Sequence, residues 1–390
     1  MSKPRELEQA EQVMDAYLAD LQTIVNIDSG TYTPEGVNRV GAYLAEHFEN
    51  WGFTTRFDRQ TEYGDHLIAT RQGSTVHGPR LLFIGHIDTV FPAGEAARRP
   101  FALSERAGKR VATGPGVLDM KSGVLLAMYA LRLLNEAGED TYQRVTFLCN
   151  SDEEVGSPSS KALIARLARQ HDAVLVFEPG RREESVVAAR KGCGRYKIEV
   201  WGRSAHAGVE PHLGRNAILE LAGQVQKLHA LNGTIPGVTV SVGIIRGGER
   251  TNVVPDYAFC ELDVRAADQS GIRAVEQAMR DITTQHLLDG TRIALSGGMG
   301  SQPFERNAQN EPLIALVQAA GAELGLDMQA VSTGGASDAN TSSWAGTPTL
   351  DGLGSAGGLA HNPDEYVELD SLPRRIALVM KLVKKIGEQA

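Results

Sequence analysis

Apolar residues in the first part of the chain switch between helical spacing and short continuous runs. Helical spacing predicts helices over residues 5–27, 35–51, 121–135 and 158–170, the last with Ser157 as its N-cap. Continuous apolar runs predict buried strands over residues 80–85, 144–149 and 172–177. Buried strands that alternate with helices are typical of a mostly parallel sheet covered on both faces. The sequence therefore predicts an α/β fold.

The pattern changes between residues 192 and 302. Alternating apolar positions predict strands over residues 195–201, 238–245, 257–264 and 291–295, and helical spacing predicts helices over 215–231 and 271–288. The resulting order, βαββαβ, is that of a ferredoxin-like domain. The first pattern then resumes, with helices near 311–324 and 371–386 and a strand near 347–350. We expect residues 1–191 and 303–390 to form one discontinuous domain, with residues 192–302 inserted as a second.

Composition narrows the class of protein. The chain has 390 residues, of which 22% are charged and 42% hydrophobic, as in ordinary globular proteins. No apolar stretch approaches the roughly 18 residues of a membrane helix, and the first residues do not resemble a signal peptide. The three cysteines, Cys149, Cys193 and Cys260, lack paired spacing, which favours a reducing cytoplasm. A net charge of −9 makes nucleic acid a poor partner.

Potential metal ligands follow the three predicted strands of the first part. His86 and Asp88 follow the first strand, Glu153 and Glu154 the second, and Glu178 the third. Carboxyl ends of parallel strands meet at one edge of a sheet, where ligands collect. Two further candidates are Asp119, just before a predicted helix, and His361, after a glycine-rich segment. Imidazole and carboxylate suit zinc, cobalt or manganese, and a carboxylate can bridge two ions.

Eight short motifs occur in one order along nearly the whole chain. They are Gly85-His86-Ile87-Asp88, residues 116–123, residues 151–156, Phe177-Glu178-Pro179, residues 202–208, residues 252–255, residues 334–338 and His361. This ordered set resembles the M20 metallopeptidases, and within them the carboxypeptidase G2 (glutamate carboxypeptidase) branch. The resemblance implies a catalytic α/β domain with an inserted ferredoxin-like lid that also forms the dimer.

The resemblance also implies roles for the candidate ligands. His86, Asp119 and Glu178 would hold one zinc ion, and Asp119, Glu154 and His361 a second, with Asp119 as the bridge. Glu153 would be the general base for a hydroxide shared by the two ions, and Asp88 would orient a ligand or tune that base. A cis peptide between Asp119 and Met120 is implied as well.

The inserted domain carries further residues that match the family's motifs. His206 and Asn252 would reach the active site of the other subunit in a homodimer and steady the substrate and its oxyanion. Arg265 would bind a substrate carboxylate, and outside the inserted domain Gly335 would also contact substrate. One segment departs from the family's pattern. Residues 301–303 are Ser-Gln-Pro and lack the arginine that relatives place there, so a preference for glutamate does not follow.

The resemblance implies an enzyme that cleaves the amide bond next to a free carboxylate. A carboxypeptidase that releases C-terminal glutamate or a similar residue is one form of this activity. An N-acyl-amino-acid deacylase or a dipeptidase is the alternative within the family, and its substrate is again a small peptide or an N-acyl amino acid. A catalytically silent binding or scaffold relative is the alternative of another class.

Overall fold

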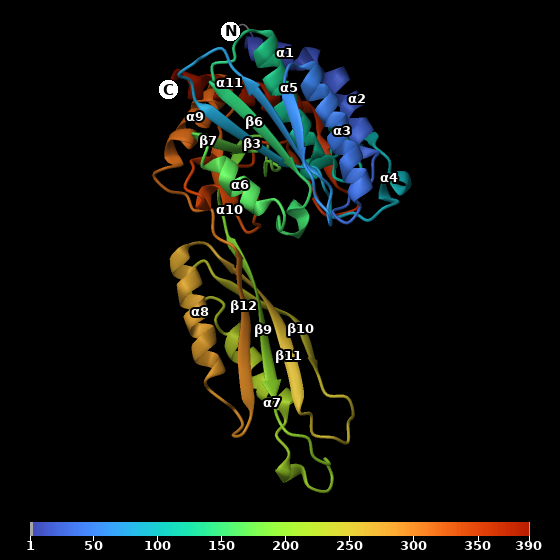
Figure 1. Ribbon diagram of the computed structural model, residues 1–390, viewed down its shortest axis with the longest axis vertical. Coiled ribbons are helices and arrows are strands. Elements are labelled where there is room, and N and C mark those ends of the chain that lie inside the picture. The colour runs from blue at the N-terminus through green and yellow to red at the C-terminus, as the bar shows by residue number, and fades with distance from the viewer. Residues whose placement is uncertain (1–2, 390) are drawn as a thin grey trace. The chain divides into compact units, whose positions relative to one another are not determined.

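The structure is a computed structural model that describes residues 3–389, and it divides into two compact units (Figure 1). Unit 1 comprises Met1–Ala188, Arg306–Ser332 and Ser337–Ala390. Unit 2 comprises Ala189–Glu305 and Thr333–Ala336. None of the helices in the described part of the chain is long and apolar enough to cross a membrane.

A six-stranded sheet forms the centre of unit 1. Its order is β1 (Thr54–Asp58), β2 (His66–Gln72), β6 (Arg144–Asn150), β3 (Arg80–His86), β7 (Ala173–Val176) and β14 (Thr349–Leu350). The four strands from β6 to β14 are parallel, whereas β1 and β2 add an antiparallel edge. The predicted mostly parallel sheet is confirmed.

Helices cover this sheet. They are α1 (Arg5–Gln12), α2 (Met14–Val25), α3 (Pro34–Asn50), α4 (Glu95–Arg98), α5 (Ser122–Glu136), α6 (Lys161–Ala168), α9 (Glu311–Ala322), α10 (Asp338–Trp344) and α11 (Leu372–Glu388). On one face, Phe83 and Phe147 pack with residues of α3, α5 and α11 in the main core. Strand residues alternate in direction, so Val174 and Val176 point to the other face, where α10 packs on β7 and contacts α6.

Short strands complete unit 1. A second sheet has the order β15 (Gly357–Gly358), β16 (Tyr366–Glu368), β5 (Lys109–Thr113) and β4 (Ala102–Arg106), and β13 (Gln329–Thr333) pairs with β8 (Ser185–Arg190). One sequence prediction is wrong here. Ser157 does not cap α6, because its φ is 58° and its hydroxyl donates to Asp338, and the helix begins only at Lys161.

Unit 2 has the predicted ferredoxin-like fold. In chain order its elements are β9 (Gly192–Trp201), α7 (Ala217–His229), β10 (Thr239–Gly247), β11 (Tyr257–Ala266), α8 (Gln269–Thr283) and β12 (Arg292–Ser301). The strands form an antiparallel sheet in the order β10-β11-β9-β12. The side chains of Ile198, Leu221 and Met279 belong to a separate core between the sheet and the two helices. Unit 2 therefore has the hydrophobic core of an independent domain.

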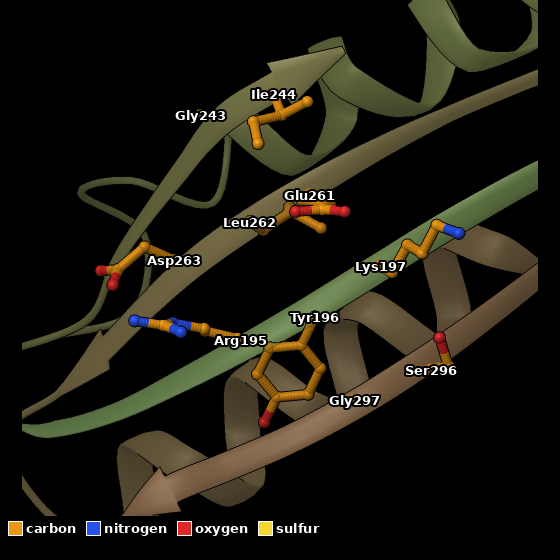
Figure 2. Close-up of a pocket in the computed structure, with 10 residues that line it drawn as sticks. All are labelled: Arg195, Tyr196, Lys197, Gly243, Ile244, Glu261, Leu262, Asp263, Ser296 and Gly297. Carbon is orange, nitrogen blue, oxygen red and sulfur yellow. The ribbon is translucent and has the colours of Figure 1, made fainter. Parts of the chain in front are cut away.

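The opposite face of the unit 2 sheet carries charged side chains of both signs. A pocket of about 300 Å³ lies on this sheet, and Figure 2 shows that Arg195 and Lys197 from β9 line it together with Glu261 and Asp263 from β11. Tyr196 points to the helical side instead, and its hydroxyl donates to Glu276 of α8 at 2.8 Å. Charges of both signs on the face without helices explain why this face needs no second layer.

Candidate metal centre

The candidate ligands gather at one edge of the unit 1 sheet. The neighbouring strands β6, β3 and β7 are parallel and end together, since His86 pairs with Asn150 and Ile84 with Val176. His86 is the last residue of β3 and Glu178 lies two residues beyond β7. The turn that follows β6 carries Glu153 and Glu154. The strand order thus brings together groups that are far apart in the sequence.

His86 is the fixed point of the cluster. Its ring is 1% exposed, and Nδ1 donates to the backbone oxygen of Asp88 at 3.0 Å. Nε2 therefore faces the carboxylates, at 3.1 Å from Asp119 Oδ1, 3.8 Å from Glu178 Oε1 and 4.0 Å from Glu153 Oε2. Burial alone would lower the pKa of His86, but the bonds with Asp119 and Asp88 raise it well above its usual value. A proton on Nε2 and a metal ion would compete for the same lone pair.

Asp119 lies between the two histidines and uses a different oxygen for each. Oδ1 faces His86 Nε2 at 3.1 Å, and Oδ2 faces His361 Nε2 at 3.2 Å. His361 Nε2 is also 3.1 Å from Glu154 Oε2. Burial would raise the pKa of Asp119, but the two imidazoles hold it far below its usual value. The peptide bond from Asp119 to Met120 is cis, which confirms that part of the resemblance.

The donor atoms fit divalent cations. Two sets of residues each bring three donor atoms within 4.8 Å of one another. One set is His86 with Glu153 and Glu178, and the other is His86 with Asp119 and Glu154. Oε1 of Glu154 is buried and has no hydrogen-bond partner among the described residues, so one ligand atom is left to bind a cation. Burial and the nearby Glu178 raise the pKa of Glu153 well above its usual value, which a positive charge among these groups would relieve.

Asp88 connects the ligand histidine to the Glu153–Glu154 turn. One carboxylate oxygen accepts the N–H of Glu153 and the other accepts the N–H of Glu154, both at 3.2 Å. The hydroxyl of Thr31 donates to the same carboxylate at 2.7 Å. Because its backbone oxygen also binds the His86 ring, Asp88 positions groups on both strands without facing the candidate ions itself.

The sequence analysis missed a second supporting carboxylate, Glu365. It is fully buried and accepts the backbone N–H groups of Gly116, Leu118 and Asp119 at 2.8 to 3.0 Å. These bonds fix the turn that presents Asp119. Burial raises the pKa of Glu365 to about 7, whereas the three N–H donors favour the ionised form. Its only sequence signal is its place four residues after His361.

His206, Asn252 and Arg265 of the inserted segment lie in unit 2, and so does Gly335, although it comes from the 303–390 segment. His206 and Asn252 are exposed neighbours, because Ala207 N donates to the Asn252 backbone oxygen at 3.0 Å. Arg265 already forms a two-pronged ion pair with Asp263, with N···O distances of 2.7 and 3.0 Å. Its third contact is with the backbone oxygen of Gly334, next to Gly335. Arg265 thus shares its guanidinium with an internal carboxylate, which the sequence analysis did not anticipate.

Comparisons with known proteins identify the family of this chain. Residues 82–385 match the sequence pattern of peptidase family M20/M25/M40. Carboxypeptidase G2 from a Pseudomonas strain is 30% identical over 380 residues, which cover 95% of this chain and 89% of that protein. Succinyl-diaminopimelate desuccinylase from Methylobacterium radiotolerans is 30% identical over 322 residues, or 77% of this chain and 80% of that protein.

Among solved structures, aminopeptidase PepT from Bacillus cereus has a similar fold. It superposes with a TM-score of 0.82 at 21% identity and covers 96% of this chain and 98% of that one. The matches in sequence confirm the resemblance drawn from the ordered motifs. The chain belongs to peptidase family M20/M25/M40, and it is a metallohydrolase of that family.

Proposed function

We propose that this hydrolase uses two zinc ions to cleave the amide bond next to a free carboxylate. The observation that carries the proposal is the placement of Asp119, whose two carboxylate oxygens face the two histidines separately. His86, Asp119 and Glu178 would hold one ion, and Asp119, Glu154 and His361 the other. Cobalt or manganese suits the same donors.

We assign Glu153 as the base and not as a ligand, as the family resemblance implies. Its Oε2 lies at the edge of the cluster, 4.0 Å from His86 Nε2, compared with 3.8 Å for Glu178 Oε1 and 3.1 Å for Asp119 Oδ1. Bound divalent ions would polarise the amide carbonyl and lower the pKa of the attacking water. Glu153 takes a proton from that water and passes it to the leaving nitrogen. Its buried position, with a side chain only 15% exposed, favours this transfer because the carboxylate is weakly solvated.

Unit 2 would act as the lid and as the dimerisation domain. Nδ1 of His206 accepts the N–H of Gly208 at 3.1 Å, so the neutral ring carries its proton on Nε2. An exposed Nε2–H can donate to an oxyanion, and we assign it to the active site of the other subunit, with Asn252 beside it. Arg265 would bind the substrate carboxylate with the donors that Asp263 leaves free, and Gly335 would line the same position. Both the homodimer and a cytoplasmic location stay predictions.

Two kinds of substrate fit this reaction. The similarity to carboxypeptidase G2 supports a carboxypeptidase, with release of C-terminal glutamate or a similar residue. The similarity to desuccinylases supports an N-acyl-amino-acid deacylase, and a dipeptidase belongs to the same alternative. In each of them the leaving group is an amino acid whose carboxylate is free.

A pair of substrates tests the proposed reaction. We expect the zinc-loaded protein to hydrolyse N-acetyl amino acids and dipeptides, and to lose about 100-fold or more in kcat/KM when the terminal carboxylate is converted to its amide. A charge-assisted arginine–carboxylate pair that forms when the substrate binds is strong enough to account for such a loss. The matched control is the N-formyl substrate, in which hydrogen replaces the methyl group of N-acetyl and the carboxylate stays intact. Equal rates for the acid and the amide would contradict the proposal.

A further inference from the structure

A pocket of about 480 Å³ lies in unit 1 beside the candidate ligand Glu154. Two loops form most of it, residues 30–33 before α3 and residues 89–93 after β3. The turn after β6 closes it with Glu154 and Val155. Because Glu154 belongs to both the pocket and the candidate metal cluster, a group in this pocket would lie beside that cluster.

The lining of this pocket is largely apolar. Val90, Phe91, Pro92 and Val155 contribute hydrocarbon surface, and Tyr32, which also lines the pocket, is 72% exposed. Val90 is itself 42% exposed, so apolar surface faces the pocket without a protein partner. Exposed apolar surface of this kind, next to a reaction centre, is typical of a site that buries an apolar part of the substrate.

The described residues give the pocket no cationic side chain, and the polar groups of Thr31 are used within the protein. The Thr31 hydroxyl donates to Asp88 at 2.7 Å, and the Thr31 N–H donates to the Thr89 backbone oxygen at 3.2 Å. None of the described residues that line the pocket is a lysine, arginine or histidine, and Glu154 is the one charged residue among them. An anionic group placed there would lose hydration without gaining a cationic partner among these side chains.

We propose that this pocket binds the acyl half of the substrate and selects uncharged, apolar acyl groups over anionic ones such as succinyl. The inference rests on the proposed function, in which the leaving amino acid carries a free carboxylate. That carboxylate pairs best with a cationic side chain, and none of the described residues that line the pocket is one, so the amino-acid half binds elsewhere and the acyl half occupies the pocket. The proposal separates this chain in specificity from its desuccinylase relatives.

Two substrates of equal shape test the selection. The probes are the N-succinyl and N-(4-methylpentanoyl) derivatives of the amino acid that the zinc-loaded protein releases fastest from its N-acetyl form. The succinyl group ends in a carboxylate, whereas the 4-methylpentanoyl group ends in an isopropyl group of similar shape. We expect kcat/KM to be higher for the 4-methylpentanoyl substrate by about tenfold or more. The reverse preference would overturn the proposal and leave the proposed function intact.

A new charge in the pocket should change the preference. Val90→Lys places an ammonium group at the pocket wall and should shift the ratio of the two kcat/KM values toward succinyl by about tenfold. Val76→Lys is the matched control, because Val76 is 74% exposed on the loop between β2 and β3 and does not line the pocket. Tyr32→Arg replaces Val90→Lys if that variant does not fold.

Each remaining outcome is decisive. A ratio that stays at the wild-type value in folded, zinc-loaded Val90→Lys and Tyr32→Arg would show that the acyl group is not in this pocket. If the wild-type protein hydrolyses none of the N-acyl amino acids, the proposed function is contradicted, and this inference with it. An equal shift in Val76→Lys would also overturn the proposal, since the effect would then come from net charge.

Discussion

Glu153→Gln should keep both metal ions and lower kcat by at least about 100-fold, the lower range for loss of a general base. The amide has the size of the carboxylate but cannot take a proton from water. KM should change little, because Glu153 does not contact substrate in the ground state in this account. Steady-state assays measure kcat and KM, and elemental analysis of the same sample measures the metal content.

The neighbouring residue provides the matched control. Glu154→Gln is the same substitution one position later, at a side chain whose Oε2 lies 3.1 Å from His361 Nε2. We expect Glu154→Gln to lose metal, and activity with it, in proportion to metal occupancy. Loss of metal in Glu153→Gln would make Glu153 a ligand, in line with its place in one donor set with His86 and Glu178, and would overturn its role as the base.

His206→Ala should lower kcat by about 100- to 1000-fold, the range seen when one oxyanion donor is removed. The effect on KM should be much smaller, since the oxyanion exists only in the transition state. His206 belongs to unit 2 and none of the candidate ligands does, so metal content should not change. His229→Ala is the control, because His229 is also exposed in unit 2, in the last turn of α7.

Mixed dimers test whether His206 acts on the other subunit. Inactive Glu153→Gln and inactive His206→Ala chains are mixed under conditions in which subunits exchange. One of the two sites in each mixed dimer would then combine an intact Glu153 with an intact His206, so about half the wild-type activity per mixed dimer should return. Demonstrated exchange without any return of activity would show that His206 does not act across the dimer.

The sequence predicted the elements whose side chains are buried in a regular pattern. The parallel strands β3, β6 and β7 are continuous apolar runs, and the alternation of β9 and β11 reports one buried and one exposed face. Strands β4 and β5 gave no such signal, because β4 is exposed along its whole length and β5 is buried only at Val111 and Ala112. A periodic apolar pattern arises where one face of an element is buried. A strand without a buried face has no such pattern and cannot be predicted from it.

Long-range polar contacts were beyond sequence reasoning. Glu365 and Asp119 are 246 residues apart, and only the fold shows that the carboxylate of one accepts the N–H of the other. The pairing of Arg265 with Asp263 is local, yet it depends on rotamers that a strand pattern leaves open. The candidate ligands were easier to find, because each follows a predicted strand or occurs in a motif of the family.

The number of metal ions needed for activity tests the central claim most directly. Protein freed of metal with a chelator is titrated with zinc, and hydrolysis of an N-acetyl amino acid is followed at each addition. We expect no activity without metal and a rise in activity that ends at two equivalents of zinc per chain, because Asp119 offers one oxygen to each of two sites. Full activity at one equivalent, or activity that survives complete removal of metal, would contradict it.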